Sequence, residues 1–171
     1  MMRGPSARPI VIAAGGTGGH LFPAEALAAE LVARGERIAL MTDARSSAFE
    51  SPAFGNAARF VLKGSGIAGV GVRGAVGGAM ALAAGTIEAR KILARLDAAA
   101  VIGFGGYPSV PPIIAARMMP KARRPATLLH EQNAVLGRAN RLLAPRADLL
   151  ALSVTDTARV PAGAHAEVVG N

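Results

Sequence analysis

The fold is decided by residues 9–20, which read PIVIAAGGTGGH. Residues 9–14 form an unbroken apolar run, which is typical of a parallel strand buried on both faces. Four glycines within residues 15–19 end this run at once. Pro23 then stands where a proline suits the first turn of a helix, so we expect a helix over residues 23–34. A strand, a glycine turn and a helix in this order predict a doubly wound α/β fold.

Apolar runs and helical patterns continue to alternate along the rest of the chain. Residues 43–56 are expected to be irregular with some helix, and the glycine-rich residues 64–78 are expected to form a loop. The expected strands span residues 37–42, 58–63, 98–104, 126–130, 148–152 and 168–169, and the expected helices span residues 79–96, 110–118 and 135–144. This alternation predicts an α/β fold with a Rossmann-like parallel sheet, helices on both faces and right-handed crossovers.

The composition narrows the class of partner. The 171 residues suffice for one domain with a core, and they carry a formal net charge of +8. Such a charge suits nucleic acid, an anionic membrane or a phosphorylated substrate. The basic residues form no run and only 4% of the residues are aromatic, which disfavours nucleic acid. Because the chain has no cysteine, disulfides and thiolate metal sites are excluded.

Neither a signal peptide nor a membrane-spanning helix is expected from the hydropathy pattern. The apolar run at residues 10–14 ends in glycines and is typical of a strand. The longest apolar stretch, residues 75–87, is broken by glycines and is shorter than the roughly 20 residues that a bilayer requires. We therefore expect a cytoplasmic protein whose membrane contact is peripheral.

The glycine turn at residues 15–20 is the first candidate site. Glycines let backbone N–H groups approach an anion, and the start of a helix adds partial positive charge. Leu21 stands at the third glycine position of the dinucleotide fingerprint, and no P-loop lysine follows, so neither motif fits. The helix dipole disfavours a positive charge at the position of His20, so we expect a neutral imidazole there that could act as a general base. The alternatives are a tight turn without a ligand and a histidine that only bonds to the loop.

Two further turns follow predicted strands: residues 103–109 read GFGGYPS and residues 130–133 read HEQN. The carboxyl ends of parallel strands meet at one edge of a sheet. We therefore expect one phosphate-binding crevice with His20, Glu131 and Asn133 near it. Structural roles, as helix caps, core contacts or ties between loops, are the alternatives for Tyr107, Ser109, His130, Gln132 and Asn133.

Four short motifs in this order and spacing resemble the MurG family. They are GGTGGH at residues 15–20, GGY at residues 105–107, HEQN at residues 130–133 and VVGN at residues 168–171. This family comprises the bacterial transferases that add N-acetylglucosamine to lipid I, giving lipid II for peptidoglycan synthesis. The resemblance covers essentially the whole chain and implies the amino-terminal domain of a GT-B glycosyltransferase.

The resemblance also implies a division of the chain. Residues 1–165 would form the Rossmann-like, acceptor-side domain. Residues 166–171 would start the connection to a missing carboxyl-terminal domain that binds most of the donor. Because the active site of such an enzyme lies in the cleft between two domains, we expect this chain alone to be inactive.

The chemistry implied by the resemblance is an inverting transfer. A hydroxyl of a lipid-linked muramyl acceptor attacks the anomeric carbon of UDP-N-acetylglucosamine (UDP-GlcNAc), and UDP leaves. No cofactor and no obligatory metal would be needed. The implied site residues are His20 and Glu131 as catalytic groups, Thr17, Gly18, Gly19 and Asn133 as donor contacts, and Gly16, Gly105, Gly106 and Tyr107 as contacts of the acceptor diphosphate.

The family docks on the cytoplasmic face of the bacterial inner membrane through an apolar patch ringed by basic residues. The matching stretch here is residues 72–96. It has no aromatic residue, which interfacial helices usually offer, so docking would rely on attraction to anionic lipid, at ~1 kcal/mol per basic residue. The alternative is a core helix with a solvated basic face. The implied patch consists of Arg73, Val76, Met80, Leu82, Ile87 and Lys91, with Arg90, Ile92, Leu93 and Arg95 on the same stretch.

Three other functions are left open. The chain would be a non-catalytic, acceptor-binding and membrane-docking subunit if a separate chain carried the catalysis. A related transferase would act on a different lipid acceptor. A nucleotide-dependent oxidoreductase is disfavoured by the absent third glycine, although Asp43 follows the second strand at a suitable distance for a ribose contact.

Overall fold

A seven-stranded, fully parallel sheet forms the centre of the structure, a computed structural model that describes residues 8–16, 18–62 and 72–170. The strands lie in the order β3-β2-β1-β4-β5-β6-β7. Their bounds are β1 (Ile10–Ala13), β2 (Ile38–Thr42), β3 (Ala58–Val61), β4 (Ala100–Gly103), β5 (Ala126–Glu131), β6 (Leu149–Leu152) and β7 (Ala166–Val168). The expected Rossmann-like parallel sheet is thereby confirmed.

The strand order reverses between β1 and β4. The chain runs outward from β1 through β2 to β3, and β4 then returns to pair with the other side of β1. The connections that leave β1 and β4 therefore diverge and open a crevice at the carboxyl ends of these strands. In doubly wound sheets this switch point is where ligands bind. Both glycine turns of the sequence lie there.

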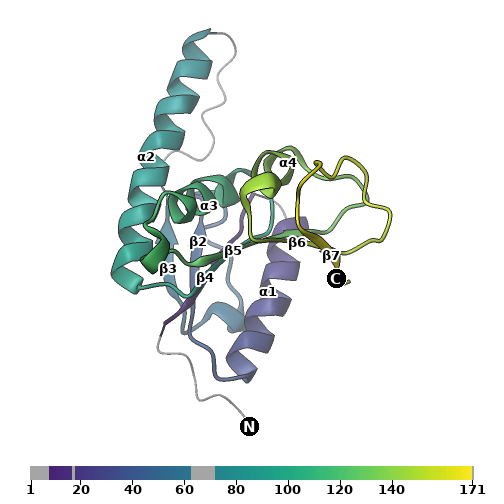
Figure 1. Cartoon of the computed structure of the whole chain (residues 1–171). Helices are drawn as coiled ribbons and strands as arrows, with labels where there is room; N and C mark the ends of the chain where they lie inside the picture. Colours follow the sequence, from purple (N-terminus) through teal and green to yellow (C-terminus); the bar gives the residue numbers. More distant parts are fainter. Residues whose placement is uncertain (1–7, 17, 63–71, 171) are drawn as a thin grey trace.

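Helices cover both faces of the sheet (Figure 1). Helix α1 (Gly18–Ala33) lies on one face, and α2 (Val72–Leu96), α3 (Val110–Arg117) and α4 (Arg138–Leu143) lie on the other. Successive side chains of a strand point to opposite faces. Accordingly, Ile12 packs in the core cluster under α1, whereas Val11 packs in the cluster under α2 and α3.

The face that carries α1 has a hollow beside that helix. It measures about 370 Å³ and is lined almost entirely by apolar side chains of α1, β4, β5 and β6, including Leu27, Ile102, Leu128 and Leu149. Among the described residues, α1 is the only helix of four residues or more on this face. Coverage of the sheet is thus less complete here than on the face of α2, α3 and α4.

Helix α1 starts earlier than the position of Pro23 predicts. It begins at Gly18, so Pro23 lies inside it, and the missing N–H of Pro23 leaves the Gly19 carbonyl without its usual helical partner. Burial of Leu21 in the core cluster of this face stabilises the early turn. As a result, His20 stands on the first turn of the helix and not in a free loop.

Two other helix starts also differ from expectation. Helix α2 begins at Val72, so residues 72–78, expected to be a loop, are helical. Glycine costs about 1 kcal/mol in a helix, but each residue added to an existing helix gains a backbone hydrogen bond. Helix α4 begins only at Arg138 because Val135 forms a parallel bridge with Ala158.

The last strand, β7, pairs in parallel with β6 and still belongs to this sheet. The division after residue 165 stays a prediction, since β7 follows it directly. Within the described ranges, no helix has the length and apolar character needed to cross a membrane.

Candidate functional site

The two glycine turns meet at the switch point, with His20 between them. A Cβ placed on Gly105 would lie 3.1 Å from Cε1 of His20, and one on Gly106 would lie 3.2 Å from its Cδ2. The backbone of the second turn thus packs directly on the imidazole, and only glycine permits this approach. His20 itself is half-buried and stays in contact with solvent.

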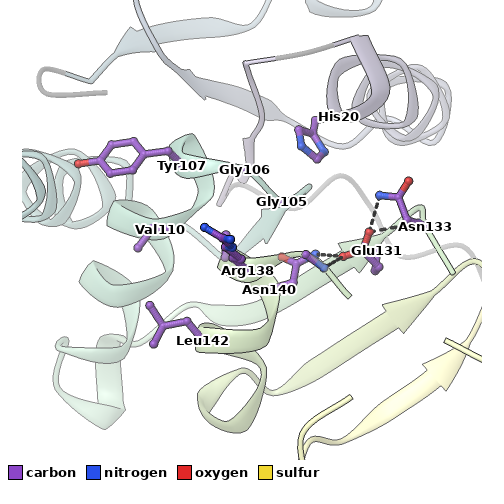
Figure 2. Close-up of a pocket in the computed structure, with 12 residues that line it drawn as sticks. His20, Gly105, Gly106, Tyr107, Val110, Glu131, Asn133, Arg138, Asn140 and Leu142 are labelled. Carbon is purple, nitrogen blue, oxygen red and sulfur yellow. Dashed lines mark hydrogen bonds between the residues drawn. The ribbon is translucent and has the colours of Figure 1, made fainter. Parts of the chain in front are cut away.

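A pocket of about 450 Å³ opens at this place (Figure 2). It brings together His20, the second glycine turn and the HEQN segment, as the sequence predicts. Its lining residues come from the start of α1, the turn after β4, the end of β5 and helix α4: His20, Gly105, Gly106, Tyr107, Val110, Glu131, Asn133, Gly137, Arg138, Ala139, Asn140 and Leu142.

The second glycine turn has a conformation that exposes its amides. Gly105 and Gly106 have φ values of +86° and +67°, which other residues rarely adopt. No described residue accepts a hydrogen bond from either N–H group. Ser109 was a candidate helix cap, but its hydroxyl instead bonds to the carbonyl oxygens of Ala13 (3.0 Å) and Gly105 (2.8 Å). This side chain ties the turn to the end of β1.

The first glycine turn is anchored to the end of β2. The N–H of Gly16 donates to Oγ of Ser46 at 2.7 Å, and the N–H of Ser46 donates to Oδ1 of Asp43 at 2.9 Å. Asp43 is only 1% exposed. Asp43 is therefore not available to contact the ribose of a nucleotide cofactor, because its carboxylate is buried and holds Ser46 in place beneath the first glycine turn. This removes the feature that had kept an oxidoreductase as an alternative.

Glu131 is buried and each of its carboxylate oxygens accepts two hydrogen bonds. Oε1 accepts from the N–H and Nδ2 of Asn133, at 3.1 and 2.8 Å. Oε2 accepts from the N–H of Gly137 and from Nδ2 of Asn140, at 2.8 and 3.1 Å. Burial acts to raise the pKa of Glu131, but these hydrogen bonds outweigh it and hold the pKa below its usual value. Glu131 thus remains a carboxylate that shapes the pocket wall.

His20 and His130 are joined through Gln132. Nδ1 of His20 lies 3.3 Å from Oε1 of Gln132, and Nε2 of Gln132 lies 3.0 Å from Nδ1 of His130. Nε2 of His130 lies 3.3 Å from the carbonyl oxygen of Gly170. Burial lowers the pKa of His130, although its hydrogen bond to Gly170 and the nearby Glu131 act in the opposite direction. The HEQN segment therefore links the pocket to the chain after β7.

Tyr107 and the described residues predicted to contact the donor lie farther from the centre of the pocket than His20 and Glu131 do. Figure 2 shows the Tyr107 ring directed away from His20 and Glu131. Its hydroxyl is buried, finds no hydrogen-bond partner in the described part of the chain, and has a pKa raised by that burial. Gly18 and Gly19 are exposed on the first turn of α1, and Asn133 is exposed at the pocket edge. Thr17 lies outside the described residues.

Arg138 and Asn140 line the pocket but were not singled out from the sequence. Asn140 is 1% exposed and bonds to Glu131 and to the carbonyl oxygen of His130. Arg138 is exposed at the pocket, and no described residue forms an ion pair with it. Their only sequence signal is that they are polar residues five and seven positions after the end of HEQN, in a segment expected to be an ordinary helix.

Among the described residues, no three His, Asp or Glu side chains are grouped so that they could hold a metal ion. The expectation that no metal is required stays a prediction, since it concerns the reaction.

The implied membrane patch divides between two faces of α2. Val76, Met80 and Ile87 are 56%, 69% and 58% exposed, and Lys91 is exposed as well. At 100° per residue these four positions fall within about 60° of arc. Leu82 instead packs against the core, and Ile92 and Leu93 are buried in it. The Arg73 side chain lies outside the described residues.

The chain is similar to known glycosyltransferases. The model of the glycosyltransferase family 28 N-terminal domain matches residues 10–151. Over its whole length the chain is 56% identical to a Granulibacter bethesdensis protein named UDP-N-acetylglucosamine–N-acetylmuramyl-(pentapeptide) pyrophosphoryl-undecaprenol N-acetylglucosamine transferase. It is 58% identical, over 99% of its length, to an Acidiphilium cryptum protein of the same name. The chain spans 44% and 46% of these two relatives.

Solved structures show the same relationship. The crystal structure of Acinetobacter baumannii MurG matches with a TM-score of 0.76 and 28% sequence identity, covering 96% of this chain and 46% of that one. A calicheamicin glycosyltransferase, at 21% identity and a TM-score of 0.53, shares the fold.

Proposed function

Because the chain belongs to the family of glycosyltransferase family 28 N-terminal domains, we propose that it is the acceptor-side half of an inverting glycosyltransferase. The donor would be UDP-GlcNAc and the acceptor lipid I, undecaprenyl-pyrophosphoryl-N-acetylmuramyl-pentapeptide, as the names of the relatives indicate. The product would be lipid II of peptidoglycan synthesis. The carboxyl-terminal half of such an enzyme would supply most of the donor site.

One observation carries this proposal: the His20 imidazole lies against the Gly105–Gly106 backbone at the mouth of a pocket of about 450 Å³. The proposed reaction transfers a sugar to an acceptor sugar that carries a pyrophosphate. It requires a base next to backbone N–H groups that have no partner. The base takes a proton, and the amides hold the anion next to it.

His20 acts as the general base in this mechanism. Its Nε2 removes the proton from the acceptor sugar hydroxyl as that oxygen forms a bond to the anomeric carbon of the donor. The bond from this carbon to the β-phosphate oxygen breaks on the opposite side, and its electron pair leaves with UDP. The configuration at the anomeric carbon inverts. The proton rests on His20 until solvent removes it.

The acceptor pyrophosphate binds at the second glycine turn. The N–H groups of Gly105 and Gly106 point to no described acceptor, and Arg138 adds a guanidinium to the wall of the same pocket. Guanidinium groups bind phosphate in a bidentate manner. The backbone of Tyr107 extends this anion site, and Gly16, whose N–H is held by Ser46, would lie at its border. On the donor side, the exposed residues Gly18, Gly19 and Asn133 would contact UDP-GlcNAc, and Thr17 is assigned to the same group.

Glu131 positions these groups. Its four accepted hydrogen bonds hold Asn133, Gly137 and Asn140 in place, and its lowered pKa keeps it charged. A carboxylate with every hydrogen-bonding site occupied is a poor proton acceptor, which favours His20 as the base.

The protein docks peripherally on the cytoplasmic face of the inner membrane. The exposed stripe of Val76, Met80, Ile87 and Lys91 on α2 supports this location. Figure 1 shows the amino-terminal part of α2 projecting beyond the body of the domain. An apolar stripe on a projecting helix suits insertion into the headgroup layer, and the net charge of +8 suits anionic lipid.

The test is the transferase assay on the full-length gene product, with UDP-GlcNAc and a soluble lipid I analogue. We expect turnover, loss of roughly 10²-fold or more in kcat for His20→Ala, and no turnover by the 171-residue chain alone. His165→Ala is the matched control, because that imidazole is 67% exposed and away from the pocket. Full activity of the His20→Ala variant would show that His20 is not the general base.

A further inference from the structure

A continuous chain of hydrogen-bonding groups runs from Gly170 to the pocket. In order, it comprises the Gly170 carbonyl, His130, Gln132 and His20, with steps of 3.3, 3.0 and 3.3 Å. Each imidazole and the amide can be oriented in two ways. Which group donates at each step of this row of hydrogen bonds therefore depends on the partners whose role is fixed. The Gly170 carbonyl is one such partner, since a carbonyl oxygen only accepts.

The orientation of the Gln132 amide follows from its surroundings. One end faces the carbonyl oxygens of Phe104 and His130, at 3.4 and 3.3 Å. Only the NH₂ group can bond to two carbonyl oxygens, so this end is Nε2 and the opposite end is Oε1. Oε1 therefore faces Nδ1 of His20.

The protonation of His130 agrees with this orientation. Its Nε2 faces the Gly170 carbonyl and must carry the hydrogen. The lowered pKa of His130 favours the neutral ring, in which Nδ1 then has a lone pair. That lone pair accepts from Nε2 of Gln132, whose hydrogen on this side is shared with the carbonyl oxygen of His130. Both sides of Gln132 thus require the same amide orientation.

We propose that Gln132 is a positioning residue that holds His20 in the tautomer with the hydrogen on Nδ1. Oε1 of Gln132 can only accept, so Nδ1 must donate, and the neutral ring has its lone pair on Nε2. No described residue occupies Nε2, which lies beside Gly106 at the pocket. The consequence for catalysis rests on the proposed function, in which Nε2 is the base.

Among the described residues, few other charged groups lie near this ring. Glu131 and Arg138 line the same pocket, and His130 lies beyond Gln132. All four acceptor positions of the Glu131 carboxylate are occupied by donors, and within the described part of the chain neither Glu131 nor Arg138 forms a hydrogen bond or ion pair with His20. The hydrogen bond to Gln132 is therefore the contact that distinguishes the two ring nitrogens.

Nitrogen-15 NMR of the ring measures this directly on the 171-residue chain, at a pH where His20 is neutral. We expect a protonated Nδ1 and an unprotonated Nε2. Gln132→Met removes the acceptor at similar size and should shift the population toward the Nε2–H form, whereas Gln132→Glu keeps an acceptor and should retain Nδ1–H. Gln132→Ala replaces the methionine variant if that variant does not fold. An Nε2–H ring in the unsubstituted chain, or an unchanged tautomer without the acceptor, would overturn the inference.

Activity then separates this inference from the proposed function. In the full-length gene product, Gln132→Met should lower kcat with KM nearly unchanged, since the base loses its orientation while the substrates still bind. If the tautomer is as expected but His20→Ala remains active, His20 is not the base and the positioning by Gln132 still stands. If His20→Ala is inactive but the ring carries its hydrogen on Nε2, the proposed function survives without this inference.

Discussion

Gly106 and His20 are in direct contact: a Cβ on Gly106 would stand 3.2 Å from Cδ2 of the imidazole. The contact joins the turn after β4 to the first turn of α1, which are more than eighty residues apart in the sequence. It places the ring of His20 against backbone that has a φ of +67°. The position of the ring and the conformation of the turn therefore depend on each other.

Gly106→Ala should displace His20 and lower activity. A misplacement near 1 Å costs roughly 10²-fold in rate. The matched control is Gly163→Ala, because Gly163 has a similar φ of +83° but nothing within 4 Å of an added Cβ. Both variants should lose about 1–2 kcal/mol of stability from backbone strain, measured by thermal unfolding. Equal activities of the two variants would show that the contact with His20 has no role.

Ser46→Ala should weaken substrate binding through the first glycine turn. It removes the acceptor of the Gly16 N–H, a bond of 2.7 Å. One such hydrogen bond is worth about 1 kcal/mol, so loss of the ordered turn should raise KM by up to about fivefold. Ser47→Ala is the control, since the hydroxyl of the half-buried Ser47 bonds only to the Ala44 carbonyl. An unchanged KM for Ser46→Ala would show that the first glycine turn does not contribute to substrate binding.

The hydrogen bonds to Glu131 should make stability depend on pH. The pKa of Glu131 is lower in the folded state than its usual 4.5, so the unfolded state binds the proton more readily. This stabilisation is present above pH 4.5 and is lost as the pH falls through the folded-state pKa.

Denaturant unfolding across this acid range measures the effect. Glu131→Gln should be less stable at pH 7 and should show a weaker decline toward low pH. Asp148, whose pKa is also lowered although burial acts to raise it, continues to supply part of the decline in both proteins. Identical pH curves for the two proteins would contradict the assignment.

Membrane docking should depend on the exposed stripe of α2. Met80→Asp places a charge at a position that is 69% exposed, so folding should be unaffected while binding to vesicles that contain anionic lipid falls. Met118→Asp is the control, since Met118 is 59% exposed but belongs to the end of α3. Equal vesicle cosedimentation of the two variants would place docking elsewhere.

Much of the fold could be predicted from the sequence because most of the parallel strands are short apolar runs; β7, which contains Glu167, is an exception. The glycine turns after β1 and β4 also indicated the ligand edge of the sheet, and the resemblance to the MurG family is confirmed. The helix starts were less predictable. Pro23 favours the first turn of a helix, but burial of Leu21 extends α1 back to Gly18.

Long-range side-chain contacts could not be predicted from local pattern. Asp43 occupies a position typical of a ribose contact, yet it is buried and bonds to Ser46. Asn140 supports Glu131 from a segment that only the tertiary fold brings there. The sequence also does not separate the two faces of α2. Ile92 and Leu93 are buried in the core, whereas Met80 is exposed.

The convergence of the two turns on one anion site is tested most directly by NMR titration of the chain with inorganic pyrophosphate. The amide signals of Gly16, Gly105 and Gly106 should shift together, with one dissociation constant. Arg138→Ala should weaken that binding, whereas Arg141→Ala, on the same helix but outside the pocket lining, should not. Shifts confined to other residues, or equal affinities of the two arginine variants, would contradict a shared pyrophosphate site at this pocket.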